Sequence, residues 1–192
     1  MKRRGIRCGM RKLIMWNLMT LDGFFDGAKP WDLGWHGTVW GPELDQLSIE
    51  QLKEVGILLF GRVTYEGMAG YWTQAKGEIA NLMNSVPKVV FSRTLTAAGW
   101  NNTRLVKGDP AEEVARLKQE AGKDLYLFGS ANLASTLTKA GLFDEYRILL
   151  APILLGRGVP LFKPGEHPVN LKVIEVKPFK SGGILLRYGP AK

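Results

Sequence analysis

Three short segments place glycine, hydroxyl and arginine side chains directly after apolar runs. They are Gly61-Arg62-Val63-Thr64, Ser92-Arg93-Thr94 and Gly129-Ser130-Ala131-Asn132. If each run is a parallel strand that leads into a helix, unpaired N–H groups and a partial positive charge face the strand end, and both suit phosphate. Glycine lets the backbone approach closely, and arginine pairs phosphate through two N–H groups. The pattern predicts a dinucleotide site, with Arg62 and Arg93 as candidates for a ribose 2′-phosphate, which favours NADP over NAD.

The same residues also have ordinary structural roles. Glycine and serine after a strand are common turn and cap residues, and arginine is common on surfaces. No glycine–lysine phosphate loop is present, and no G-x-G-x-x-G follows an apolar run. The segment 156–158 (GRG) precedes no helical pattern and is interpreted as a loop between strands. The dinucleotide site is therefore a hypothesis that depends on all three segments lying together.

Asp22 is the candidate catalytic residue. It stands in the sequence MTLDG (19–23), directly after the first apolar run. Asp-Gly is a strong turn signal, so a structural role is one interpretation. The other is that Asp22 lies at the mouth of a pocket, where it binds a substrate amide or assists proton transfer.

Trp31, Trp35 and Trp40 lie close together, with His36 among them and four glycines nearby. Such a loop can form the wall of a pocket and stack on a flat heterocycle, which makes Trp35 and Trp40 candidates for a substrate pocket. The alternatives are a loop packed over a sheet face and a dimer contact.

The sequence gives no support for a metal site or for a serine nucleophile. Its two histidines, His36 and His167, are far apart and have no acidic partners at ligand spacing. No serine lies in an elbow motif that would pair it with either histidine. The single cysteine, Cys8, cannot form a disulfide within the chain.

Short apolar runs alternate with helical patterns as far as residue 140. The expected strands cover 12–19, 55–60, 88–91, 103–106, 124–128, 146–150, 171–176 and 184–188, and the expected helices cover 42–53, 64–70, 76–84, 110–121 and 131–140. This alternation predicts an α/β fold with a mainly parallel sheet covered by helices. The last three strands have no helix between them, which predicts antiparallel additions at the sheet edge.

Two of the helices have clear end signals. Asp109 is expected to cap one, with Pro110 in its first turn and Gly122 at its end. Ser130 is expected to cap the other, and Gly141 to end it.

The net charge of +8 is concentrated at the N-terminus. Residues 1–12 hold six basic side chains and no acidic one, whereas the rest of the chain holds 20 basic and 18 acidic side chains. We therefore expect a disordered basic extension over residues 1–10 and a single domain over 11–190, with no nucleic-acid partner. Asn17, Thr20 and Asp22 interrupt the pattern of a signal peptide, and no apolar run is long enough to span a membrane. A cytoplasmic location is expected.

Five motifs in this order resemble a known family. They are 19–23 (MTLDG), 59–66 (LFGRVTYE), 89–93 (VVFSR), 127–130 (LFGS) and 149–162 (LLAPILLGRGVPLF). Together they resemble the dihydrofolate-reductase-like superfamily, and within it the C-terminal reductase domain of riboflavin-biosynthesis deaminase–reductases and its stand-alone relatives. The resemblance implies a three-layer α/β/α fold with about eight strands, NADPH as cofactor, and a homodimer.

The resemblance also implies roles for individual residues. Asn17 and Asp22 would line the nicotinamide and substrate side, and Ser92 and Arg93 would lie near the 2′-phosphate. Contacts with the other cofactor phosphates would come from Gly61, Arg62, Thr64, Gly129, Ser130, Asn132 and Leu133.

The expected activity is hydride transfer from NADPH to a small-molecule heterocycle, carbonyl or imine, as in the 5-amino-6-(5-phosphoribosylamino)uracil reductases. The alternatives are reduction of a pteridine and binding of NADPH without turnover. The His/Cys signature of a zinc deaminase is absent, which excludes that activity. The segment 65–68 (YEGM) stands where the riboflavin enzymes have an Asp–Pro segment, and it is more similar to dihydrofolate reductases and to stand-alone members.

Overall fold

The computed structural model describes residues 10–163 and 168–191, and these form two sheets. Eight strands make the main sheet in the order β5-β4-β3-β6-β1-β7-β10-β9, while β2 and β8 pair separately. The strands are β1 (Leu13–Thr20), β2 (Phe24–Asp26), β3 (Val55–Gly61), β4 (Lys88–Phe91), β5 (Thr103–Val106), β6 (Asp124–Phe128), β7 (Glu145–Ala151), β8 (Val159–Pro160), β9 (Leu171–Pro178) and β10 (Ile184–Pro190). The helices are α1 (Pro42–Glu54), α2 (Arg62–Trp72), α3 (Glu78–Ser85), α4 (Pro110–Lys118) and α5 (Ala131–Lys139), with a 3₁₀ turn, η1, at Gly34–Thr38.

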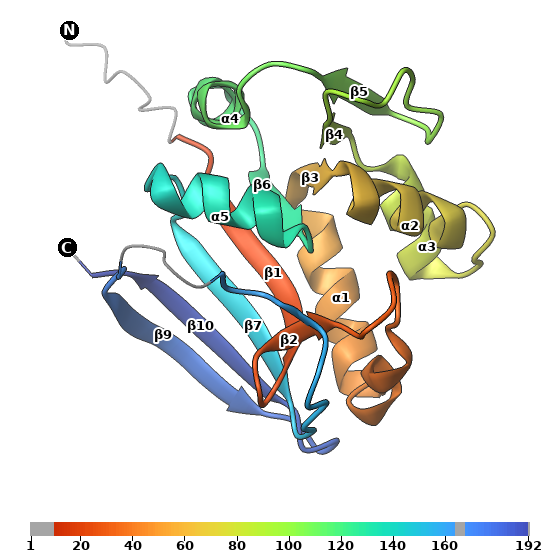
Figure 1. Cartoon of the computed structure of the whole chain (residues 1–192), viewed down its shortest axis with the longest axis vertical. Helices are drawn as coiled ribbons and strands as arrows, with labels where there is room; N and C mark the ends of the chain where they lie inside the picture. The colour runs from red at the N-terminus through yellow and green to blue at the C-terminus, as the bar shows by residue number, and fades with distance from the viewer. Residues whose placement is uncertain (1–9, 164–167, 192) are drawn as a thin grey trace, which may run out of the picture.

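The main sheet is parallel from β5 to β7 and antiparallel beyond it. Every neighbouring pair from β5 through β1 to β7 runs parallel, whereas β10 is antiparallel to β7 and β9 is antiparallel to β10. Figure 1 shows β9 and β10 at one end of the sheet and β4 and β5 at the other. The predicted fold class and the antiparallel edge are confirmed. The first of the last three strands, β7, nevertheless joins β1 in parallel, because α5 carries the chain back across the sheet.

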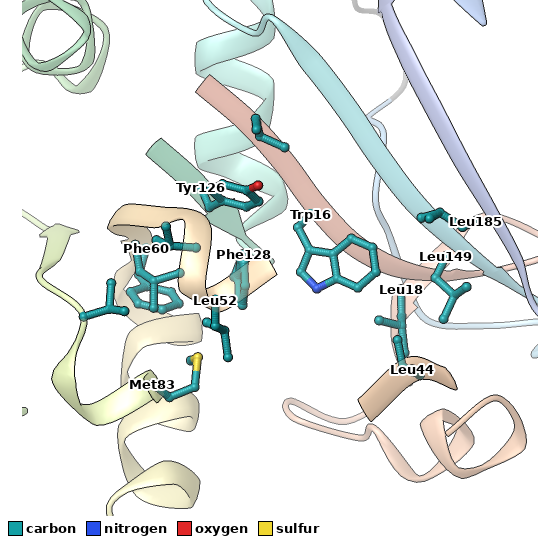
Figure 2. Close-up of a cluster of buried hydrophobic side chains, with 14 of the residues drawn as sticks. Trp16, Leu18, Leu44, Leu52, Phe60, Met83, Tyr126, Phe128, Leu149 and Leu185 are labelled. Carbon is teal, nitrogen blue, oxygen red and sulfur yellow. The ribbon is translucent and has the colours of Figure 1, made fainter. Parts of the chain in front are cut away.

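Helices cover both faces of the sheet, because its central strands are apolar on both sides. On β1, Ile14, Trp16 and Leu18 belong to the core under α1, α2 and α3, and Leu13 and Met15 belong to the core under α4 and α5. Figure 2 shows the indole ring of Trp16 between Phe128 of β6 and Leu18 of its own strand. The alternation of side chains along a strand thus places Trp16 on the same face as α1.

The small sheet of β2 and β8 was not predicted. Its strands are three and two residues long, too short for a periodic pattern to show. Helix α2 begins at Arg62 rather than at residue 64, so Arg62 stands in the first turn of the helix. Helix α4 ends at Lys118, before the predicted end at residue 121.

Both predicted cap residues stand at the N-cap position of their helix, but only Asp109 makes a capping hydrogen bond. The Asp109 carboxylate accepts hydrogen bonds from the N–H groups of Ala111 and Glu112, as expected. Ser130 precedes α5, but its hydroxyl makes no capping hydrogen bond and its backbone is left-handed, with φ of 62°. Gly141, with φ of 64°, follows the end of α5 as predicted.

The basic extension expected over residues 1–10 lies outside the described residues except for Met10, and so do Cys8 and His167. The single domain over 11–190 stays a prediction. In the described part of the chain, no helix is long and apolar enough to cross a membrane.

Candidate active site

The carboxyl ends of β1, β3, β4 and β6 meet beside one cavity of about 840 Å³, here called the first cavity. These four strands are neighbours and parallel, so their ends lie at the same edge of the sheet. Most of the predicted cofactor-binding residues line it, namely Asn17, Gly61, Arg62, Thr64, Ser92, Gly129, Ser130, Asn132 and Leu133. Arg93 is exposed and does not line it. The three segments are therefore brought together by the strand order.

A hydrogen bond joins two of these segments. The Ser130 hydroxyl accepts from the Gly61 N–H at 2.8 Å, so it links the ends of β6 and β3 instead of capping α5. Gly129 has φ of 59°, and a Cβ on it would lie 2.8 Å from Cγ2 of Thr64. Glycine is favoured at this position, because a side chain would be strained in the left-handed conformation and its Cβ would crowd Thr64.

The first turns of α2 and α5 border the first cavity, and no side chain caps either helix. The residues of these turns that line the cavity are Arg62, Val63 and Thr64 from α2 and Ala131, Asn132 and Leu133 from α5. Free N–H groups at a helix N-terminus bind anions. The edge of the sheet thus offers two such termini to a ligand.

Asn17 presents an unpaired donor beside the first cavity. Its Oδ1 accepts from the Gly129 N–H at 2.8 Å, which fixes the orientation of the amide. Its Nδ2 is buried and has no hydrogen-bond partner among the described residues. Leaving a buried donor unpaired costs about 1–3 kcal/mol, so a ligand oxygen at this place would be favoured.

The charged side chains lining the first cavity are mostly basic. Lys29, Arg62 and Lys163 line it, and Asp26 is the acidic residue among the described residues that do so. Arg62 is about half exposed, and its guanidinium lies 3.5 Å from Glu66, one turn along α2. An exposed pair at this distance holds the guanidinium only weakly, so Arg62 can turn towards an anion.

Asp26 fixes the start of the loop that carries Trp31, a role that was not predicted from the sequence. Its carboxylate accepts from the N–H groups of Gly27, Trp31 and Asp32. Trp31 is held at φ of 65°, and its ring lies so close to Gly67 of α2 that a Cβ there would overlap it. Asp26 is followed by glycine, and this turn signal would have indicated the role of Asp26. No local signal indicates that Trp31 contacts Gly67.

A second cavity of about 470 Å³ adjoins the first. The residues common to both linings are Trp16, Leu18, Trp31, Leu33, His36, Met68 and Phe128. Trp40, a predicted pocket residue, lines the second cavity. Its indole N–H donates a hydrogen bond to the Asp45 carboxylate at 2.9 Å. Trp35, the other one, is buried in the core and lines neither cavity.

His36 lies between the two cavities as a neutral imidazole. Burial lowers its pKa to about 4, because a charged ring would lose its hydration. Its Nε2 is buried and unpartnered among the described residues, and its ring meets Trp35 edge-on at a centroid distance of 4.4 Å. His36 therefore contributes a polar edge without a charge near neutral pH.

Asp22 lies outside both cavity linings. Its carboxylate accepts from the Thr20 hydroxyl at 2.6 Å and from the Gly156 N–H at 2.7 Å. The Thr20 bond is the largest of the effects that lower the pKa of Asp22. These contacts connect the turn after β1 to the segment before β8, and they favour the ionised form over a proton donor.

Metal ligands do not gather anywhere in residues 10–163 and 168–191: no three His, Cys, Asp or Glu side chains are grouped to hold an ion.

The chain is similar to proteins of known sequence or structure. It is 32% identical over 183 residues to the uncharacterized protein YyaP of Bacillus subtilis strain 168, covering 93% of this chain and 94% of that protein. A crystal structure from Shewanella sp. PV-4, of a protein named provisionally for riboflavin biosynthesis, is 25% identical with a TM-score of 0.79, covering 94% and 99% of the two chains. Dihydrofolate reductase from Enterococcus faecalis, complexed with NADP(H), has a TM-score of 0.63 at 14% identity, covering 94% and 97%.

The fold is thus that of dihydrofolate reductase. A family description, the RibD C-terminal domain, matches residues 11–185, nearly the whole described chain. The predicted family resemblance is confirmed, and the chain belongs to the RibD C-terminal domain family.

Proposed function

We propose that this protein is an NADPH-dependent reductase that transfers hydride to a C=N or C=O group of a small heterocycle. The observation that carries the proposal is the convergence of three strand-end segments, two uncapped helix N-termini and a basic side chain on one cavity. The NADP(H) named for the Enterococcus dihydrofolate reductase, which shares the fold, supports the choice of cofactor.

The residues that line the first cavity suit the phosphate groups of a dinucleotide. We assign the pyrophosphate to the first turns of α2 and α5, because free N–H groups are available there. Arg62 is assigned to the 2′-phosphate, since it lines the cavity and has only a weak partner in Glu66. Arg93 is exposed and directly follows Ser92, which lines the cavity, and it is the second candidate for that phosphate.

The unpaired Nδ2 of Asn17 suits the carboxamide oxygen of a nicotinamide. Bound NADPH would supply the hydride from C4 of that ring. The protein's own contribution is to hold the acceptor close to it and to exclude water with the shared aromatic wall of Trp16, Trp31 and Phe128.

We propose that the proton comes from water. Both oxygens of Asp26 are taken by backbone N–H groups, and Asp22 is held ionised away from the cavities. Asp22 then acts as a positioning residue, because it anchors the turn at the end of β1.

We also propose a homodimer formed through β9. This edge strand exposes large apolar side chains, among them Val173 at 61%, Ile174 at 49% and Val176 at 53%. A long apolar edge strand left bare promotes aggregation, so a second copy is a natural cover.

Thermal unfolding with NADPH or NADH tests the cofactor assignment, and loss of absorbance at the NADPH band on adding acceptors tests turnover. We expect NADPH to raise the melting temperature of the wild type more than NADH does. The Arg62→Ala variant should lose about tenfold in NADPH affinity and little in NADH affinity, the cost of one charge-assisted contact. Equal losses for both cofactors would instead point to a general phosphate contact.

Arg93→Ala is the matched comparison for Arg62→Ala, because it removes the same charge from a position outside the cavity lining. A larger loss of NADPH affinity in Arg93→Ala than in Arg62→Ala would transfer the 2′-phosphate role to Arg93. Stabilisation by NADPH without turnover of any acceptor would favour a binding protein, and no stabilisation by either cofactor would overturn the proposal.

A further inference from the structure

The second cavity has no charged side chain in its wall. Its described lining residues include no Asp, Glu, Lys or Arg, whereas three basic residues and one acidic residue line the first cavity. A phosphate or carboxylate moved into such a space would lose its hydration without gaining a counter-charge. The wall therefore disfavours an anionic ligand group, and equally a cationic one.

Aromatic side chains dominate the same wall. Trp16, Trp31, Trp40, Tyr71, Trp72 and Phe128 all line it. Flat rings stack on such surfaces with little loss of conformational freedom. Its volume of about 470 Å³ is in the range of small-molecule sites.

One polar group in the wall has a fixed orientation. Gln51 of α1 is buried, and its Oε1 accepts from Nη1 of Arg147 at 3.1 Å. Reversing the amide would bring its NH₂ against a guanidinium, so Nε2 must be the end turned away from Arg147. That Nε2 has no partner among the described residues.

The position of Arg147 is itself secured. Glu145 accepts from its Nε at 2.6 Å, and Nη1 also donates to the Tyr126 hydroxyl at 2.9 Å. Arg187 donates to the same Glu145 carboxylate at 2.6 Å. Arg187 also donates to Glu175 at 2.7 Å, so two arginines face two glutamates and their charges balance. This network holds Gln51 as a donor, and the wall in front of it offers a dipole rather than a cation.

We infer that the second cavity receives the hydride acceptor, and that this acceptor is an uncharged, flat heterocycle with a carbonyl or ring-nitrogen acceptor atom that accepts from Gln51. The identification of the ligand as a hydride acceptor rests on the proposed function. The preference of the cavity for a neutral ligand does not depend on it. The reaction adds hydride from NADPH to the electron-poor carbon and a proton from water to the adjacent nitrogen or oxygen, which leaves NADP⁺ and the reduced ring. A ribosyl phosphate attached to the ring would find no cation in this cavity.

Two probes with the same ring test this inference. Lumiflavin carries a methyl group where riboflavin 5′-phosphate carries a ribityl phosphate. Their affinities are measured by calorimetry on the full chain saturated with NADP⁺, so that the basic first cavity is filled. We expect lumiflavin to bind at least tenfold more tightly, and equal affinities or tighter binding of the phosphate would overturn the inference.

Two variants locate the binding. Gln51→Leu should weaken lumiflavin about tenfold, the loss of one hydrogen bond. Ser48→Lys places a cation in the cavity wall, because Ser48 of α1 lines it, and should shift the preference towards riboflavin 5′-phosphate. Gln46→Lys adds the same charge to the exposed side of α1 and should leave the preference unchanged.

The outcomes separate this inference from the proposed function. If NADPH binds but the two flavins bind equally, the proposed function stands and the neutral acceptor is wrong. If NADPH does not bind but lumiflavin is preferred in the unloaded protein, the preference of the cavity stands and the reductase proposal fails. A preference that Gln46→Lys changes as much as Ser48→Lys would also overturn the assignment to this cavity.

Discussion

Several single residues at the site have roles that their type alone does not indicate. Ser130 was expected to cap α5, but its hydroxyl accepts from Gly61 and joins two strand ends. In Asn17 and Gln51 the side-chain oxygen accepts a hydrogen bond that fixes the amide, and the NH₂ group has no partner among the described residues. A serine after a strand predicts a helix cap on statistical grounds. The donor that its hydroxyl actually meets depends on the neighbouring strand in the sheet. For Ser130 that donor is Gly61, which is 69 residues away in the sequence.

His36 should make stability depend on pH. Its pKa is about 4 in the folded protein, below the value of about 6.5 in an unfolded chain. Between these values the unfolded state binds more protons, so stability is present above pH 6.5 and is lost as the pH falls towards 4. We expect the wild type to lose about 2 kcal/mol more than His36→Phe between pH 7 and pH 5, measured by urea unfolding.

The comparison with His36→Phe isolates this histidine, because acidic groups and His167 are the same in both proteins. Parallel changes of the two proteins with pH would contradict the neutral, buried imidazole. Titration of the His36 ring by NMR in the folded protein gives an independent value for its pKa.

At the scale of secondary structure, local patterns predicted much and tertiary contacts decided the rest. The eight strands of the main sheet and the five helices were predicted because each has its own apolar period or end signal. The wall of the second cavity was not predicted, because its residues come from separate helices: Ser48 from α1, Met68 from α2 and Ile79 from α3. Side chains from separate helices leave no common spacing in the sequence.

Two glycines of α2 provide a matched test of the wall between the cavities. The Trp31 ring packs directly against the backbone of Gly67, whereas a Cβ at Gly70 would meet nothing within 4 Å. Alanine at an open helical position stabilises by about 0.5–1 kcal/mol, so Gly70→Ala should be more stable than the wild type.

Gly67→Ala should be destabilised by about 1–3 kcal/mol instead, because the new methyl group overlaps Trp31 and forces its ring away. Urea unfolding monitored by circular dichroism measures both variants. Stabilisation of Gly67→Ala by the same amount as Gly70→Ala would show that Trp31 does not occupy this place.

At the scale of the whole molecule, the parallel and antiparallel parts of the sheet differ in their position relative to the cavities. The parallel strands bring their carboxyl ends to the cavities, and this arrangement follows from the order of strands and helices in the sequence. The antiparallel strands β10 and β9 lie at the far edge, and β9 has no partner strand on its outer side in the described chain (Figure 1). The apolar alternation of β9 predicted a strand, but sequence pattern alone does not state which of its sides another chain would cover.

The proposed homodimer gives a prediction at this scale. Val173→Asp places a charge on the exposed face of β9, and burying it in an interface without a partner would cost several kcal/mol. Light scattering should give the mass of two chains for the wild type and of one for the variant. Leu154→Asp is the control, because Leu154 is 70% exposed and belongs to the loop between β7 and β8 rather than to β9, and this variant should remain a dimer. A monomeric wild type, or dissociation of both variants alike, would remove β9 as the interface and leave its apolar face to another partner.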